Sequence, residues 1–193
     1  MPVKPISIAE PFTRGEIQRE LQAVREWSGT FWSGFSVDEF FAPTGDAWSP
    51  ADNVRHLIKS NRPVAKALSL PRLLILVRFG PGLRPSRTYS ALKTTYLEAL
   101  ASGLRAGRYT PSPVPPEQQT AGDHATVIAR LDSTLADLIG AMGRWPEWWL
   151  DHLRLPHPGL GPLTVREMLF FTLYHNTHHA LNVARRKELL PAG

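Results

Sequence analysis

Three of the seven histidines lie within five positions of one another near the end of the chain, in the stretch YHNTHHALN at residues 174–182. In a helix, His175 and His179 are one turn apart on one face, with their Cβ atoms about 5–6 Å from each other. Both imidazoles can then bind one divalent ion, at the roughly 2.0–2.1 Å length of a zinc–nitrogen bond. His178 follows His175 by three residues and is also within reach, so the spacing leaves open whether His178 or His179 is the second ligand.

A third candidate ligand is His56, in the stretch WSPADNVRHLIKS at residues 48–60. Asn53 and Ser60 flank it on a helical face that is otherwise apolar, and polar side chains on a core-facing helix need partners. If this helix lies beside the terminal one, His56 completes a three-histidine site. Such a site leaves one coordination position for water or substrate, which is the catalytic rather than the structural pattern of zinc.

The remaining histidines, His124, His152 and His157, lie in polar or proline-rich stretches and are expected to face solvent.

The terminal stretch lacks the glutamate of the H-E-x-x-H zinc-protease motif. A general base must therefore come from elsewhere, or the metal itself must activate the nucleophile. The alternative to a metal site is a purely structural role for these histidines, because paired histidines also occur by chance in buried helices. The sequence identifies no catalytic residue.

The composition excludes several kinds of site. The chain has no cysteine, which rules out disulfides, thiolate metal ligands and a cysteine nucleophile. The formal net charge is +5, but the arginines are scattered apart from Arg72, Arg78, Arg84 and Arg87. A solvated basic surface is favoured over a nucleic-acid site, although this cluster is also a candidate for the mouth of a pocket that takes an anionic substrate.

The elements that carry these residues are predicted to be helices. Apolar residues recur at steps of three and four in 13–33, in 86–103 and in about 119–143. Ser49 and Pro50 are suited to start a helix, which Pro63 should kink or stop. Thr164 and Glu167 form a capping box for the last helix, which is predicted to run to about Lys187.

The connections carry no regular pattern. Residues 71–88 are predicted to be a loop with one short turn of structure, residues 105–120 a proline-rich connection and residues 144–162 an aromatic connection, and no strand is predicted. With no repeat and no dividing linker, residues 1–193 are expected to form one all-α domain, in which 1–12 are an N-terminal extension. The chain shows neither a signal peptide nor a membrane-length apolar run, so a cytoplasmic protein is expected.

The histidine-bearing segments resemble the DinB/YfiT-like superfamily. The similarity lies in WSPADNVRHLI (48–58), in residues 84–117, and in LRLPHPGLGPLTVREMLFFTLYHNTHHALNVAR (153–185). The resemblance implies a four-helix bundle, often a homodimer, whose divalent metal, zinc or nickel, is held by His56, His175 and His179. It thereby favours His179 over His178, which spacing alone does not.

The resemblance also implies candidate functions. Members of the superfamily include thiol S-transferases and a mycothiol-dependent isomerase, so the leading expectation is metal-dependent transfer of a low-molecular-weight thiol to an electrophilic small molecule. In that reaction Arg55 and the arginines of 71–88 are candidates for holding an anionic group. The alternatives are metal-assisted hydrolysis and a non-catalytic metal- or ligand-binding bundle. Asn53 stands where relatives carry an acidic or amide group, and residues 71–88 and 104–118 are insertions that reshape the pocket. Neither a nucleic acid nor a membrane is expected as a partner.

Overall fold

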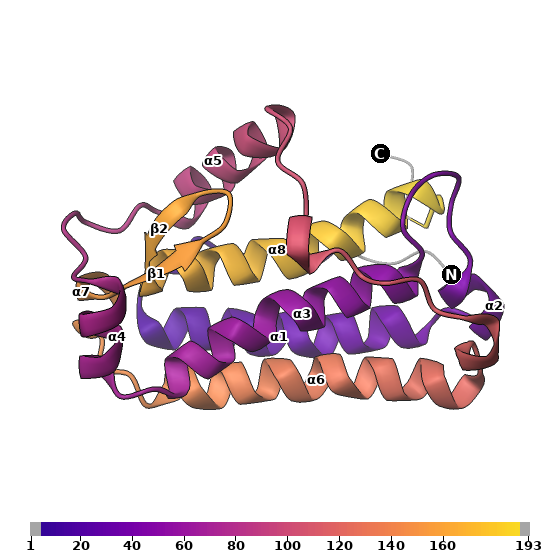
Figure 1. Ribbon diagram of the computed structural model, residues 1–193, viewed down its shortest axis with the longest axis horizontal. Helices are drawn as coiled ribbons and strands as arrows, with labels where there is room; N and C mark the ends of the chain where they lie inside the picture. The colour runs from indigo at the N-terminus through magenta and orange to yellow at the C-terminus, as the bar shows by residue number, and fades with distance from the viewer. Residues whose placement is uncertain (1–4, 190–193) are drawn as a thin grey trace.

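Four long helices form the body of the protein in the computed structural model, which describes residues 5–189 (Figure 1). They are α1 (Arg14–Ser33), α3 (Pro50–Ser69), α6 (Ala121–Gly143) and α8 (Val165–Arg186). Each begins at a capping box, in which a Ser or Thr side chain and an acidic side chain three residues later satisfy each other's backbone N–H groups. The predicted all-α four-helix bundle is confirmed.

Shorter elements fill the connections between these helices. They are α2 (Val37–Phe41), α4 (Arg72–Phe79), α5 (Tyr89–Ala101), the 3₁₀ turns η1 (Gly107–Tyr109) and η2 (Pro116–Gln118), α7 (Trp149–His152), and the strands β1 (Arg154–His157) and β2 (Gly161–Thr164). The two strands pair in antiparallel fashion, with Leu155 opposite Leu163. Figure 1 shows α5 and this hairpin on the outer side of α8, away from the rest of the bundle.

Two apolar clusters fill the interior and leave a polar layer between them along α8. One cluster includes Phe170 and Leu173 of α8, and the other includes Ala180 and Val183. The intervening residues from His175 to Thr177 are also buried, although all three are polar. Because buried polar groups must be hydrogen-bonded or bound to a ligand, this layer is where a functional site is expected.

Two predictions about the connections were wrong, and one of the two effects expected of Pro63 is absent. Pro63 does not stop α3, which continues to Ser69, because apolar burial on both sides of the proline outweighs its cost of about 3 kcal/mol. Residues 72–79 form the helix α4 rather than a loop with a single turn. The β1–β2 hairpin was missed because each strand has only four residues and contains a proline, which removes any alternating pattern.

The described part of the N-terminal extension lies against the bundle, where Ile6 and Ile8 pack on the larger apolar cluster. Among residues 5–189, no helix combines the length and the apolar character needed to cross a membrane.

Candidate metal centre

Helices α3 and α8 bring the three predicted histidines together. The Nε2 atom of His175 lies 3.1 Å from Nε2 of His56 and 3.1 Å from Nε2 of His179. One ligand atom from each ring falls within 4.8 Å of the others. His178 does not join this group, because its two ring nitrogens contact Tyr174 Oη and Asn182 Nδ2 on α8 itself.

The outer nitrogens of two of these rings face oxygen atoms that accept hydrogen bonds. His56 Nδ1 lies 3.0 Å from the carbonyl oxygen of Tyr109, and His179 Nδ1 lies 2.7 Å from Oδ1 of Asn53. The Asn53 amide is oriented by its own Nδ2, which donates to the carbonyl oxygens of Trp48 and Ser49. Because each Nδ1 must then donate, the Nε2 atoms of His56 and His179 carry lone pairs when the rings are neutral.

His175 sits between these two rings and is the most constrained of the three. Its ring stacks on Phe171 at 4.8 Å between centroids, and its Nδ1 lies 3.5 Å from the hydroxyl of Ser60. That hydroxyl donates to the carbonyl oxygen of Leu57, so it can only accept from the imidazole. Burial lowers the pKa of His56, and burial together with the neighbouring imidazoles lowers the pKa of His175 and His179 well below the ordinary value.

These features fit a divalent metal ion. Three neutral imidazoles direct Nε2 atoms at one point, and a proton on His175 Nε2 could satisfy only one of its two neighbours. Carbonyl and amide acceptors behind ligand histidines are the usual way in which proteins orient such ligands and fix their tautomers. The histidine group therefore has the donor set and the supporting hydrogen bonds of a metal site.

A buried amide pair, whose member on α8 directly follows His175, fixes the register of α3 against α8. Asn61 Nδ2 donates to Asn176 Oδ1 at 3.0 Å, and Asn176 Nδ2 donates back to Asn61 Oδ1 at 3.3 Å. Both side chains are almost fully buried. Sliding either helix would break both hydrogen bonds between these buried amides, so the pair holds His56 and His175 at their observed separation.

The segment of residues 104–112, called here the covering segment, passes over the histidines between α5 and η2. Three successive positions on one face of α3, Arg55, His56 and Lys59, donate to backbone carbonyl oxygens of this segment over 2.6–3.0 Å. The carbonyl group that orients His56 thus belongs to the expected insertion. Arg55, a candidate for anion binding, is instead occupied in holding the covering segment.

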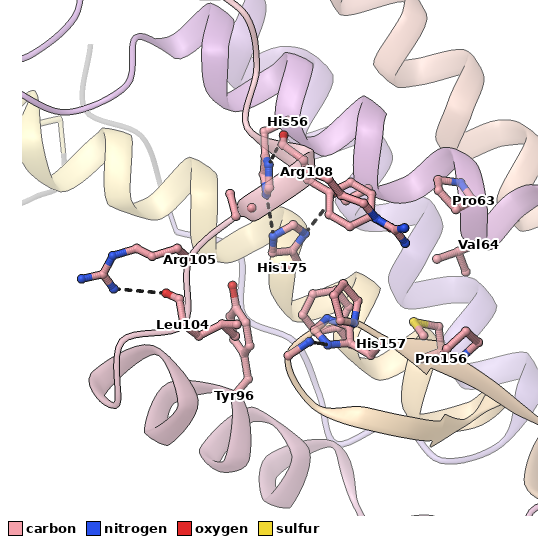
Figure 2. Close-up of a pocket in the computed structure, with 18 of the residues that line it drawn as sticks. His56, Pro63, Val64, Tyr96, Leu104, Arg105, Arg108, Pro156, His157 and His175 are labelled. Carbon is pink, nitrogen blue, oxygen red and sulfur yellow. Dashed lines mark hydrogen bonds between the residues drawn. The ribbon is translucent and has the colours of Figure 1, made fainter.

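A cavity of about 620 Å³ opens beside the histidine group (Figure 2). Its walls come from α3, α5, the covering segment, the β1–β2 hairpin and α8. Apolar side chains dominate, among them Leu100, Leu155, Met168 and Phe171, and no aspartate or glutamate in residues 5–189 lines it. The cavity therefore suits a neutral or anionic molecule with an apolar body.

The cationic residues of the cavity are not those proposed from the sequence. None of Arg72, Arg78, Arg84 and Arg87 lines it, whereas Arg105 and Arg108 of the covering segment do. Arg84 and Arg87 bind the buried Glu167, and Arg72 donates to a backbone carbonyl group. The four arginines of residues 72–87 were proposed because they are close together in the sequence, but only the three-dimensional path of the chain shows which arginines reach the cavity.

Two of the three histidines expected to face solvent do not. His157, in β1, lines the cavity and packs on Phe171. His124 lies in the first turn of α6 and packs on Phe40, with its Nε2 3.2 Å from the carbonyl oxygen of Trp32. The prediction for His152 is confirmed, since it is exposed and stacks on Trp148.

The start of α8 is anchored by two buried charged residues. Glu167, the capping-box residue, accepts hydrogen bonds from both Arg84 and Arg87. Its neighbour Arg166 forms a bidentate pair with Asp151, at 2.7 and 2.8 Å, and also contacts Glu147. These ion pairs fix the helix that carries two of the three histidines.

Comparison with known proteins places this arrangement in a family. The model of the DinB superfamily matches residues 21–182, and the chain belongs to this superfamily. The fold is similar to that of YfiT from Bacillus subtilis, described as a probable metal-dependent hydrolase with an unusual four-helix bundle topology. The two structures align with a TM-score of 0.54 over 96% of this chain and 95% of YfiT, at 15% sequence identity, which establishes the shared fold. No curated protein matches the sequence significantly.

Proposed function

We propose that the protein is a divalent-metal-dependent enzyme in which His56, His175 and His179 hold the ion and the adjoining cavity takes a small-molecule substrate. The observation that carries the proposal is the convergence of three neutral Nε2 atoms at the wall of a large cavity. A structural zinc site usually has four protein ligands, whereas three leave a position for an exogenous ligand. Imidazole ligands suit both zinc and nickel.

The reaction we favour is transfer of a low-molecular-weight thiol to an electrophile. A divalent ion at this centre would lower the pKa of a bound thiol or water and so supply a nucleophile near neutral pH. Such a nucleophile needs no separate carboxylate base, which agrees with the lack of acidic side chains in the described cavity wall. A volume of about 620 Å³ lies within the usual range for small-molecule sites.

Hydrolysis is the second candidate, and the fold similarity to YfiT favours it. The two reactions differ in whether turnover requires an added thiol. Metal-loaded protein should be assayed against a panel of electrophiles and of esters and amides, with and without a small thiol. Thiol-dependent consumption of an electrophile supports transfer, and thiol-independent cleavage supports hydrolysis. No turnover under either condition favours a binding protein.

Metal content tests the site itself. Untagged wild type and the single variants His56→Ala, His175→Ala, His179→Ala and His178→Ala should be analysed for bound metal. We expect about one divalent ion per chain in wild type, lost in the first three variants. The His178→Ala control should keep it, because the ring nitrogens of His178 contact Tyr174 and Asn182 of α8 rather than the histidine group. A wild type that takes up neither zinc nor nickel would refute the proposal.

A further inference from the structure

The turn between β1 and β2 fixes the imidazole of His157 in one tautomer. Its Nδ1 accepts hydrogen bonds from the backbone N–H groups of Gly159, at 3.2 Å, and Leu160, at 3.0 Å. A backbone N–H can only donate, so this nitrogen must carry a lone pair. The proton of the neutral ring is therefore on Nε2.

That Nε2–H group is available to a ligand. Among the described residues it makes no hydrogen bond, and the ring lines the cavity. The imidazole packs on Phe171 at 4.3 Å between ring centroids, and Phe171 stacks in turn on His175. Figure 2 shows His157 on the hairpin side of the cavity, facing the same space as His175. A hydrogen-bond donor of fixed direction thus lies one aromatic ring away from the histidine group.

The ring is also held neutral. Burial lowers the pKa of His157 to about 4, so the imidazole carries no charge near neutral pH. A neutral donor among apolar side chains suits an oxygen atom that is neutral in the free ligand and gains negative charge during reaction. Because Nδ1 is occupied by the turn and Nε2 is already protonated, the ring is not suited to act as a general base.

We propose that His157 is a substrate-binding residue whose Nε2–H donates to the carbonyl oxygen of an otherwise apolar electrophile. This inference rests on the proposed function, because the nucleophile, a thiol or water, would be activated by the metal ion that the histidine group holds. The nucleophile forms a bond to the carbonyl carbon, and the π electron pair moves to the oxygen, where the Nε2–H bond stabilises it. In an addition, the proton lost by the nucleophile ends on that oxygen. In a displacement, the electron pair on oxygen re-forms the carbonyl group, the bond from the carbonyl carbon to the leaving group breaks, and the leaving group departs with its bonding pair and takes the proton.

The test uses the full chain in metal-free and zinc-loaded forms, with acetophenone as the probe. Its isostere α-methylstyrene has the same shape but lacks the oxygen. Long-range ¹H–¹⁵N spectra should show His157 as the Nε2–H tautomer, and acetophenone should shift its Nε2–H resonance. We expect metal-free wild type to bind acetophenone roughly 5- to 10-fold more tightly than α-methylstyrene, the value of about one hydrogen bond.

Variants separate the donor from the packing of the ring. His157→Phe keeps an aromatic ring against Phe171 and should abolish the preference for the ketone, whereas His157→Gln supplies an amide donor and should retain part of it. The matched control His152→Phe alters an exposed histidine outside the cavity and should behave as wild type. Equal affinity for the two probes, failure of wild type to bind either, or an Nδ1–H tautomer would each overturn the proposal. Because the preference is measured without metal, failure of the metal centre leaves it unchanged and is detected separately by metal analysis.

Discussion

The buried carboxylate of Glu167 should contribute stability that depends on its charge. The side chain is fully buried at the start of α8 and accepts hydrogen bonds from the guanidinium groups of Arg84 and Arg87, and from the backbone N–H groups of Arg87 and Thr164. The variant Glu167→Gln keeps the shape of the side chain and removes the charge. We predict that it destabilises the protein by about 3 kcal/mol at neutral pH.

Two routes lead to this magnitude. Burial by itself would raise the pKa of Glu167, but the hydrogen bonds from Arg84, Arg87 and Thr164 outweigh it and lower the pKa from 4.5 to about 2. Because a pKa difference of one corresponds to about 1.4 kcal/mol, this lowering of the Glu167 pKa corresponds to a stabilisation of about 3 kcal/mol. Breaking a buried ion pair costs about 3–5 kcal/mol, and the lower end applies here because both arginines are partly exposed and can be rehydrated.

The pH dependence follows from the direction of the pKa change. Because the folded-state pKa is depressed, the contribution of Glu167 is fully present above the unfolded-state pKa of 4.5. It is lost as the pH falls from 4.5 towards the folded-state pKa of about 2. The difference in stability between wild type and Glu167→Gln should therefore be constant from neutral pH down to about 5 and should shrink below that.

Urea denaturation followed by tryptophan fluorescence, at neutral pH and at about pH 5 and pH 3, measures the difference. The matched control is Glu16→Gln, which alters the same capping-box position of α1, where the carboxylate is exposed and has no arginine hydrogen bond. The control should lose much less stability. The reasoning is refuted if Glu167→Gln lies within about 0.5 kcal/mol of wild type at neutral pH, or if the difference persists unchanged at about pH 3.

Three further outcomes are expected. Asn53→Leu removes the acceptor behind a ligand histidine and should weaken zinc binding about 10- to 100-fold, measured by competition with a chelator, with the helical circular dichroism spectrum unchanged. Asn61→Leu leaves the buried Oδ1 of Asn176 without its donor and should cost about 1–3 kcal/mol in urea denaturation, whereas changing both residues to leucine should restore part of the loss. Gly82→Ala places a Cβ atom 2.2 Å from a backbone oxygen of α7 and should lower the melting temperature, whereas Gly29→Ala, where the helix has open space, should raise it.

The long helices could be predicted because their signals are local. Apolar residues at steps of three and four, together with caps such as Ser49 and Thr164, depend only on neighbours within a turn or two. The start of α3 and both ends of α8 fell close to the predicted residues. Pro63 marks the limit of such signals, since its local preference was overridden by burial that the sequence does not display.

Only part of the candidate site could be predicted from the sequence. Spacing placed His175 on a shared face with both His178 and His179, and the choice between them depends on which ring is directed towards α3. That orientation is set by the packing of two helices more than a hundred residues apart in the chain. His56 was a candidate from its polar neighbours on α3, and the resemblance to the superfamily favoured His179 over His178. The structure brings one ligand atom of each of the three rings within 4.8 Å of the others.

Only the tertiary structure reveals the contacts between groups that are far apart in the sequence. The Tyr109 carbonyl oxygen behind His56 is a backbone atom, which no side-chain pattern reveals. From the sequence, His157 was expected to face solvent in a proline-rich stretch. The four-residue strand β1 instead directs its side chain towards the cavity. Glu167 could be recognised as a helix cap from its sequence, but its burial and its arginine partners could not. Local sequence specifies helices because their hydrogen bonds are local, whereas a site assembled from distant segments is specified only once those segments pack together.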